Sequence, residues 1–74
     1  MKELELVALK DDLPEHGLVK GDIGTVVLVH QGGEGYEVEF ATLTGKTMAV
    51  VTLRANQVRP IKPREIAHAR QVAV

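Results

Sequence analysis

The stretch Tyr36–Phe40 alternates strictly between apolar and acidic residues, and this alternation restricts the fold more than any other feature. Successive side chains of a β-strand point to opposite faces, so Tyr36, Val38 and Phe40 share one face while the two intervening glutamates share the other. Such a strand has one face in a core and the other in water. Other short apolar or β-branched runs lie between turn-forming residues, and together they predict an all-β domain.

The turns between these runs carry the residues that turns require. Gly32, Gly33 and Gly35 tolerate the positive φ angles of a hairpin connection. A longer loop, residues 10–21, contains two Gly, one Pro and the apolar anchors Leu13 and Leu18, so we expect it to be ordered. The expected strands cover residues 6–9, 22–30, 36–40, 47–53 and 58–61, with a tight turn at 42–46 and a single helical turn at 54–57.

A chain of 74 residues supports one core, so we divide it into a barrel at 1–61 and a C-terminal tail at 62–74. Pro63 suits the first position of a helix and good helix formers follow it, which predicts a short helix with Ile66, Ala69 and Ala73 on one stripe. Because so short a helix is unstable alone, we expect it to pack on the barrel. Truncation after Lys62 should then lower the stability appreciably.

Three segments carry a family resemblance: LPEHGL at 13–18, GDIGTVV at 21–27 and YEVEF at 36–40. They resemble a family of small bacterial proteins classed only as domain of unknown function 4926, which implies no activity. The order of elements looks like that of the SH3-like barrel, so the expected fold is a small five-stranded SH3-like barrel with a short C-terminal helix or tail. The second segment is also similar to the opening of KOW-type barrels of ribosomal and transcription proteins, and to small barrels that serve as subunits of larger enzymes.

Several classes of function are disfavoured by what the chain lacks. Without Cys there is no disulfide scaffold, thiolate zinc site or Cys nucleophile, and without Ser there is no Ser-His-Asp constellation. Tyr36 and Phe40 are the only aromatic residues. They are too few to line a groove for proline-rich peptides or to form an aromatic cage for methylated lysine. We therefore expect no enzymatic activity, no cofactor and no small-molecule substrate.

A metal site in the long loop is one alternative function. The acidic loop with Asp11, Asp12, Glu15 and His16, and Asp22 nearby, has metal-ligand chemistry, but it matches no recognised metal-binding spacing. We expect these side chains to cap turns or face water, and we predict no metal site.

The other alternative is an RNA-contacting, KOW-like barrel that uses Arg54, Arg59 and Lys62 around the last strand. A net charge of −1 and the lack of an aromatic stacking platform make nucleic acid an unfavoured partner. The first ten residues do not read as a signal peptide, and the longest apolar runs are too short to span a bilayer. The expected location is the cytoplasm, with no membrane association.

The prediction of a function rests on the two long expected strands, residues 22–30 and 47–53. These strands are more apolar than one core face requires. If Val27 and Val29 face the interior, Val26 and Leu28 point outward and require a cover. The candidates for this cover are the C-terminal helix, a second copy of the chain and another protein. This pattern predicts a module that acts by protein contact, as a homo-oligomer or as an accessory or regulatory subunit, and by analogy one that neutralises a neighbouring effector. The expected interface residues are Val26, Leu28, Tyr36, Val51, Leu53, Ile66 and Ala69.

Overall fold

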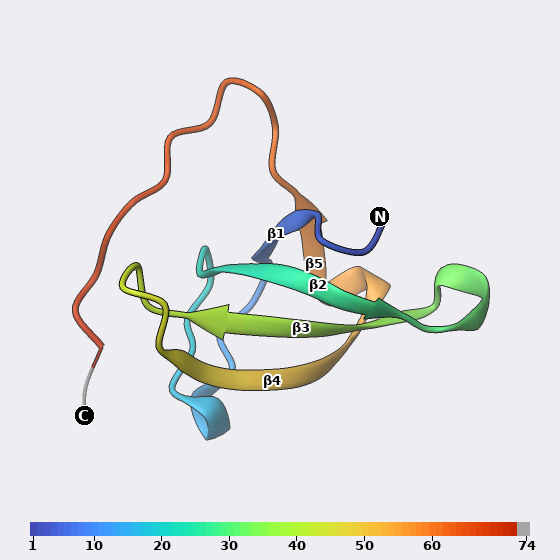
Figure 1. Ribbon diagram of the computed structural model, residues 1–74, viewed down its shortest axis with the longest axis horizontal. Helices are drawn as coiled ribbons and strands as arrows, with labels where there is room; N and C mark the ends of the chain where they lie inside the picture. The colour runs from blue at the N-terminus through green and yellow to red at the C-terminus, as the bar shows by residue number, and fades with distance from the viewer. Residues whose placement is uncertain (73–74) are drawn as a thin grey trace.

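The structure is a computed structural model that describes residues 1–72; residues 73 and 74 of the expected tail, including Ala73 of the expected stripe, lie outside the described residues. The described residues form one antiparallel sheet of five strands in the order β4-β3-β2-β1-β5 (Figure 1). The strands are β1 (Leu6–Leu9), β2 (Ile23–Val29), β3 (Gly35–Ala41), β4 (Thr47–Arg54) and β5 (Val58–Pro60), with single 3₁₀ turns η1 (Pro14–His16), η2 (Gln31–Gly33) and η3 (Ala55–Gln57) between them.

This arrangement confirms the all-β prediction. The sheet curls around its core like a barrel, but in the described chain β4 and β5 remain its two edges and the sheet does not close. The order is consistent with the expected SH3-like barrel, and the expected helical turn before the last strand is the 3₁₀ turn η3. Gly32 and Gly33 in the β2–β3 hairpin adopt φ angles of 82° and 70°, as the hairpin prediction required.

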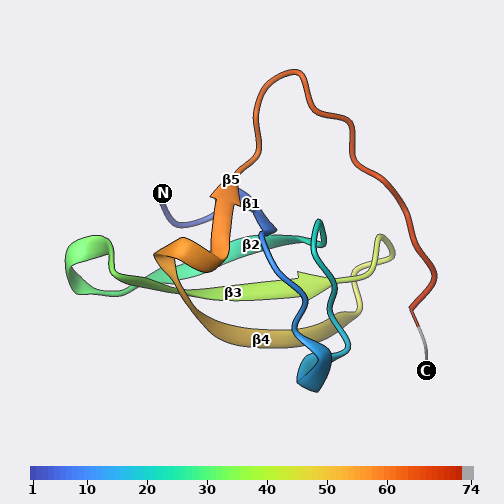
Figure 2. The same cartoon turned by 180° about the vertical axis from the view of Figure 1, so that it is seen from behind.

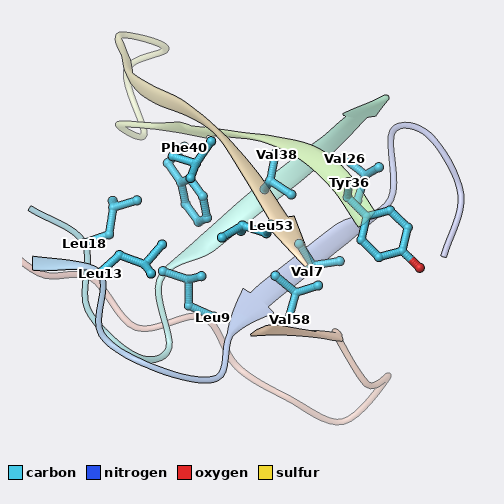
Figure 3. Close-up of a cluster of buried hydrophobic side chains, with 11 residues drawn as sticks. Val7, Leu9, Leu13, Leu18, Val26, Tyr36, Val38, Phe40, Leu53 and Val58 are labelled. Carbon is cyan, nitrogen blue, oxygen red and sulfur yellow. The ribbon is translucent and has the colours of Figure 1, made fainter. Parts of the chain in front are cut away.

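The inner face of the sheet holds an aliphatic core with two aromatic residues. The alternation of β3 is confirmed, because its three apolar side chains are buried and its two glutamates are not. The long loop adds Leu13 and Leu18, which pair through an isolated bridge and close one end of the core, while Tyr36 lies at the other end (Figure 3). The cluster consists of Val7, Leu9, Leu13, Leu18, Val26, Tyr36, Val38, Phe40, Val51, Leu53 and Val58.

The register of β2 explains why the predicted faces of this strand were wrong. Val26 pairs with Val38 and is completely buried, whereas Leu28 pairs with Glu37 on the outer face. Between these pairs Val27 forms a bulge, an extra residue that shifts the alternation by one position. Strict alternation across residues 22–30 therefore assigned Val26 to the wrong side.

The prediction of a C-terminal helix was also wrong for the described residues. Beyond β5 the described residues contain a turn at 63–64 and otherwise irregular chain up to Val72. Figures 1 and 2 show this segment arching away from the sheet and returning beside the β3–β4 turn. A helix advances about 1.5 Å per residue and an extended chain about twice as far, so the extended form covers this distance with few residues. We call residues 61–72 the C-terminal segment.

Candidate functional site

The first candidate surface is the free edge of β4. This strand has eight residues and pairs with β3 along its length, from Arg54 opposite Gly35 to Thr47 opposite Ala41. Within the described chain, residues 47–54 make no backbone–backbone hydrogen bond to a segment other than β3, and the Arg54 N–H donates to Gln57 Oε1 at 2.7 Å. Half of the amide and carbonyl groups of an edge strand point away from the sheet, so β4 offers a row of unpaired donors and acceptors.

The outer face next to this edge mixes apolar and acidic residues in rows. One row crosses the sheet from Leu6 through Thr25 and Glu39 to Val50. A second row contains Leu28, Glu37 and Thr52. The apolar side chains in these two rows are exposed by 51% at Leu6, 46% at Leu28 and 56% at Val50. Because a carboxylate interrupts each row, these side chains do not form one continuous apolar patch.

The carboxylate of Glu37 sits in a small hydrogen-bond network. The Thr52 hydroxyl donates to both of its oxygens, at 2.9 and 2.7 Å, and His30 Nε2 lies 2.6 Å from Oε2. The hydrogen bond from Thr52, followed by that from His30, lowers the pKa of Glu37. The network ties Thr52 on β4 and His30, the residue after β2, to Glu37 on β3.

The second candidate surface lies where the C-terminal segment meets the barrel. The Arg70 guanidinium binds Asp22 in a bidentate manner, with Nε donating to Oδ1 at 2.7 Å and Nη2 to Oδ2 at 2.6 Å. The same Nη2 donates to the Gly17 carbonyl oxygen at 3.1 Å. Two parallel charge-assisted hydrogen bonds are the geometry in which arginine recognises a carboxylate most specifically.

Asp22 is held in place by the barrel as well as by Arg70. The backbone N–H of Val19 donates to Asp22 Oδ2 at 3.0 Å, within the loop that precedes β2. Burial raises the pKa of Asp22, but the hydrogen bonds from Arg70 and Val19 and the charge of Arg70 outweigh it and lower the pKa. The receptor for the guanidinium is therefore an ionised, oriented carboxylate at neutral pH.

A second ion pair fixes the start of the C-terminal segment. The Arg59 guanidinium on β5 contacts both oxygens of Glu65 at 2.7 Å, and the Lys62 N–H donates to Glu65 Oε1 at 2.8 Å. The hydrogen bond from Arg59, followed by that from Lys62, lowers the pKa of Glu65 to about 2. Arg59 is one of the three residues suggested for RNA contact, and here its charge is matched by a carboxylate of its own chain.

Between the C-terminal segment and the barrel lies a groove of about 580 Å³. Its barrel side includes Leu18, Ile23, Phe40 and Met48, and its other side is formed by residues 67–72. No residue of 66–72 donates or accepts a backbone hydrogen bond to the rest of the described chain. The segment is therefore attached by side chains.

The predicted interface residues separate into two groups. Val26, Tyr36, Val51 and Leu53 are core residues with exposed fractions of 7% or less, so they are unavailable for contact in the folded chain. Leu28, Ile66 and Ala69 are exposed, and Ile66 at 95% is almost fully so. Sequence reasoning missed the pair of Arg70 and Asp22, because residues 48 positions apart carry no local pattern that links them.

The acidic loop is built as a structural element. Asp12 Oδ1 accepts the Lys20 N–H at 2.8 Å, so this side chain and Asp22 each cap a turn of the loop. In the part of the chain that the structure describes, no group of three or more His, Asp or Glu side chains is arranged to hold a metal ion. Residues 1–72 also contain no helix with the length and apolar character that crossing a membrane demands.

The fold and the loop chemistry define a small all-β domain with one open sheet. The family model of the Domain of unknown function (DUF4926) matches residues 3–60, a range that ends at the last residue of β5. The chain belongs to this family. No curated protein and no solved structure matches it significantly.

Proposed function

We propose that this protein is a non-catalytic interaction module that contacts another polypeptide through the free edge of β4. The observation that carries the proposal is this eight-residue edge, which lacks a partner strand in the described chain. An exposed edge of this length supports the addition of a further strand, with the backbone giving affinity and the alternating side chains giving specificity.

The two edges of the sheet differ in how well they are protected. β5 has three residues and ends at Pro60, which has no N–H to donate. β4 contains no proline, and the nearest basic residues are at its margins, Lys46 before the strand and Arg54 at its last position. Natural edges are usually blocked by prolines, central charges, shortness or bulges. β4 lacks the first three, and its one irregularity is at Met48, near the start of the strand.

A second copy of this chain is the occupant that we propose for the edge. Two antiparallel β4 strands related by a twofold axis form a closed, self-complementary contact. Registers centred on Val51 and on Val50 both place inward residues opposite inward residues, but the register centred on Val50 sets Lys46 opposite Arg54. Like charges directly opposite each other are destabilising, so the first register is favoured.

The test measures the mass of the full-length protein by sedimentation equilibrium over a wide range of concentrations. We expect the native chain to dimerise and Val50→Lys to remain monomeric, because a lysine on the edge opposes strand pairing. Leu28→Lys is the matched control, with the same charge on the same outer face but away from the edge, and it should still dimerise. Circular dichroism verifies that both variants are folded.

Two results would overturn the proposal for a second copy. A native chain that stays monomeric at every concentration has no self-association at β4. A dimer that survives Val50→Lys but is lost in Leu28→Lys uses the outer face of β2 instead of the edge.

A further inference from the structure

The groove beneath the C-terminal segment touches β4 only near the start of that strand, at Met48, and it contains a receptor for an arginine side chain. Its guanidinium receptor, Asp22 with the Gly17 carbonyl, belongs to the barrel, and Val19 orients it independently of the C-terminal segment. The side chain of Asp22 is only 16% exposed, so water screens the ion pair less than it would on an open surface. This part of the groove is ready to accept an arginine from any chain that reaches it.

The resident segment occupies the groove poorly. The apolar residues that it places along the groove are Ala67, Ala69 and Val72, and about 580 Å³ between the two sides remains unfilled. Between Lys62 and Arg70 its one large aliphatic residue, Ile66, is 95% exposed and does not line the groove. Small side chains in an apolar groove forgo burial that larger ones would gain.

The attachment is also easy to release. No backbone hydrogen bond joins residues 66–72 to the rest of the described chain, and the hydrogen bonds to the barrel within this stretch are those of Arg70. The core cluster contains no residue beyond Val58. The barrel therefore does not depend on the C-terminal segment for its own packing.

We propose that this groove is a docking site for an extended, arginine-bearing segment of a partner protein, and that the C-terminal segment is a built-in occupant which the partner displaces. The partner's arginine takes the place of Arg70 on Asp22 and Gly17. Aliphatic side chains larger than alanine next to that arginine fill the space that Ala67 and Ala69 leave. The inference does not depend on self-association at β4.

The probe is a synthetic peptide with the sequence of residues 62–72 and the change Ala69→Leu, added to the full-length protein. The receiving protein is the variant Arg70→Ala, which frees its own segment from Asp22. Binding is followed by NMR shifts of the amides of residues 17–23 and by calorimetry. We expect the Ala69→Leu peptide to bind about tenfold more tightly than the unchanged peptide, because it buries three more carbon atoms.

Three controls separate docking from unspecific contact. A peptide that also carries Arg70→Ala should lose about tenfold or more in affinity, because two charge-assisted hydrogen bonds are removed. The protein variant Arg70→Ala with Asp22→Asn should weaken the peptide similarly. The native protein should bind the peptide more weakly than Arg70→Ala does, because its own segment competes at a high effective concentration.

The proposal fails on any of four results. Equal binding with and without Asp22 places the peptide elsewhere, and equal binding by the native and Arg70→Ala proteins removes the competition. A C-terminal segment that stays docked in Arg70→Ala shows that the ion pair is not its attachment. A concentration-dependent dimer that Arg70→Ala abolishes, while Val50→Lys leaves it intact, identifies a second copy's segment as the occupant.

Discussion

The barrel and the C-terminal segment are held by different forces. The barrel buries a continuous aliphatic cluster and contains no buried polar or charged side chain among the described residues. The C-terminal segment is attached through two ion pairs, Arg59 with Glu65 and Arg70 with Asp22. Apolar burial responds to side-chain volume, whereas partly exposed ion pairs respond to pH and salt. The two regions should therefore fail under different conditions.

The largest expected effect is from truncating the centre of the core. Leu53 is 2% exposed, and Leu53→Ala should destabilise the protein by about 2–5 kcal/mol, because it leaves a cavity as well as losing burial. Leu43, at 96% exposure, is the control, and Leu43→Ala should change stability by less than about 0.5 kcal/mol. Urea unfolding measures both, and equal effects would contradict the location of the core.

A smaller loss is expected from adding one methyl group at Gly24. A Cβ there would lie 2.5 Å from Val38 Cγ1 and 2.9 Å from the Glu39 carbonyl oxygen. Because this contact involves backbone as well as side chain, Gly24→Ala should cost about 1–3 kcal/mol. Thr25→Ala, the next position on β2, should cost less, and thermal unfolding compares the two. A neutral Gly24→Ala would show that β2 and β3 are not packed this closely.

Acid should release the C-terminal segment while the barrel stays folded. The folded-state pKa of Glu65 is lowered from 4.5 to about 2, and that of Asp22 is lowered from 3.8. A lowered carboxyl pKa stabilises the attached state above the unfolded value, and this stabilisation is lost as the pH falls through the folded value. The NMR shifts of the amides of residues 64–72 should therefore move toward unfolded values between about pH 4.5 and 2, while those of β3 keep their folded values. Simultaneous loss of both regions would contradict this separation.

The smallest expected effect is from removing the C-terminal segment. The sequence alone predicted an appreciable loss on truncation after Lys62, but the described core ends at Val58 and exposed ion pairs contribute little. The melting temperature should fall by about 4 °C or less. Differential scanning calorimetry measures it, and a loss as large as that of Leu53→Ala would show that the segment belongs to the core.

Most of the fold could be predicted because local preference and tertiary structure agree in the barrel. Alternation in residues 36–40, β-branched residues in the long strands and glycines at positive φ each specify their own element, so an all-β sheet followed from the residues alone. The candidate site was less accessible. Of the seven predicted contact residues, Leu28, Ile66 and Ala69 are exposed, while four others pack in the core.

Two features were decided only by tertiary structure. The bulge at Val27 leaves Val26 facing inward and Leu28 facing outward. Pairing with β3 sets this register, and the sequence has no local signal for the extra residue. The C-terminal segment contains good helix formers, yet it runs extended to bring Arg70 to Asp22, 48 residues away. The weak helix preference of this segment is overridden in the folded chain, where Arg70 pairs with Asp22. The sequence alone shows the helix preference, but it does not show that Asp22 lies within reach of Arg70.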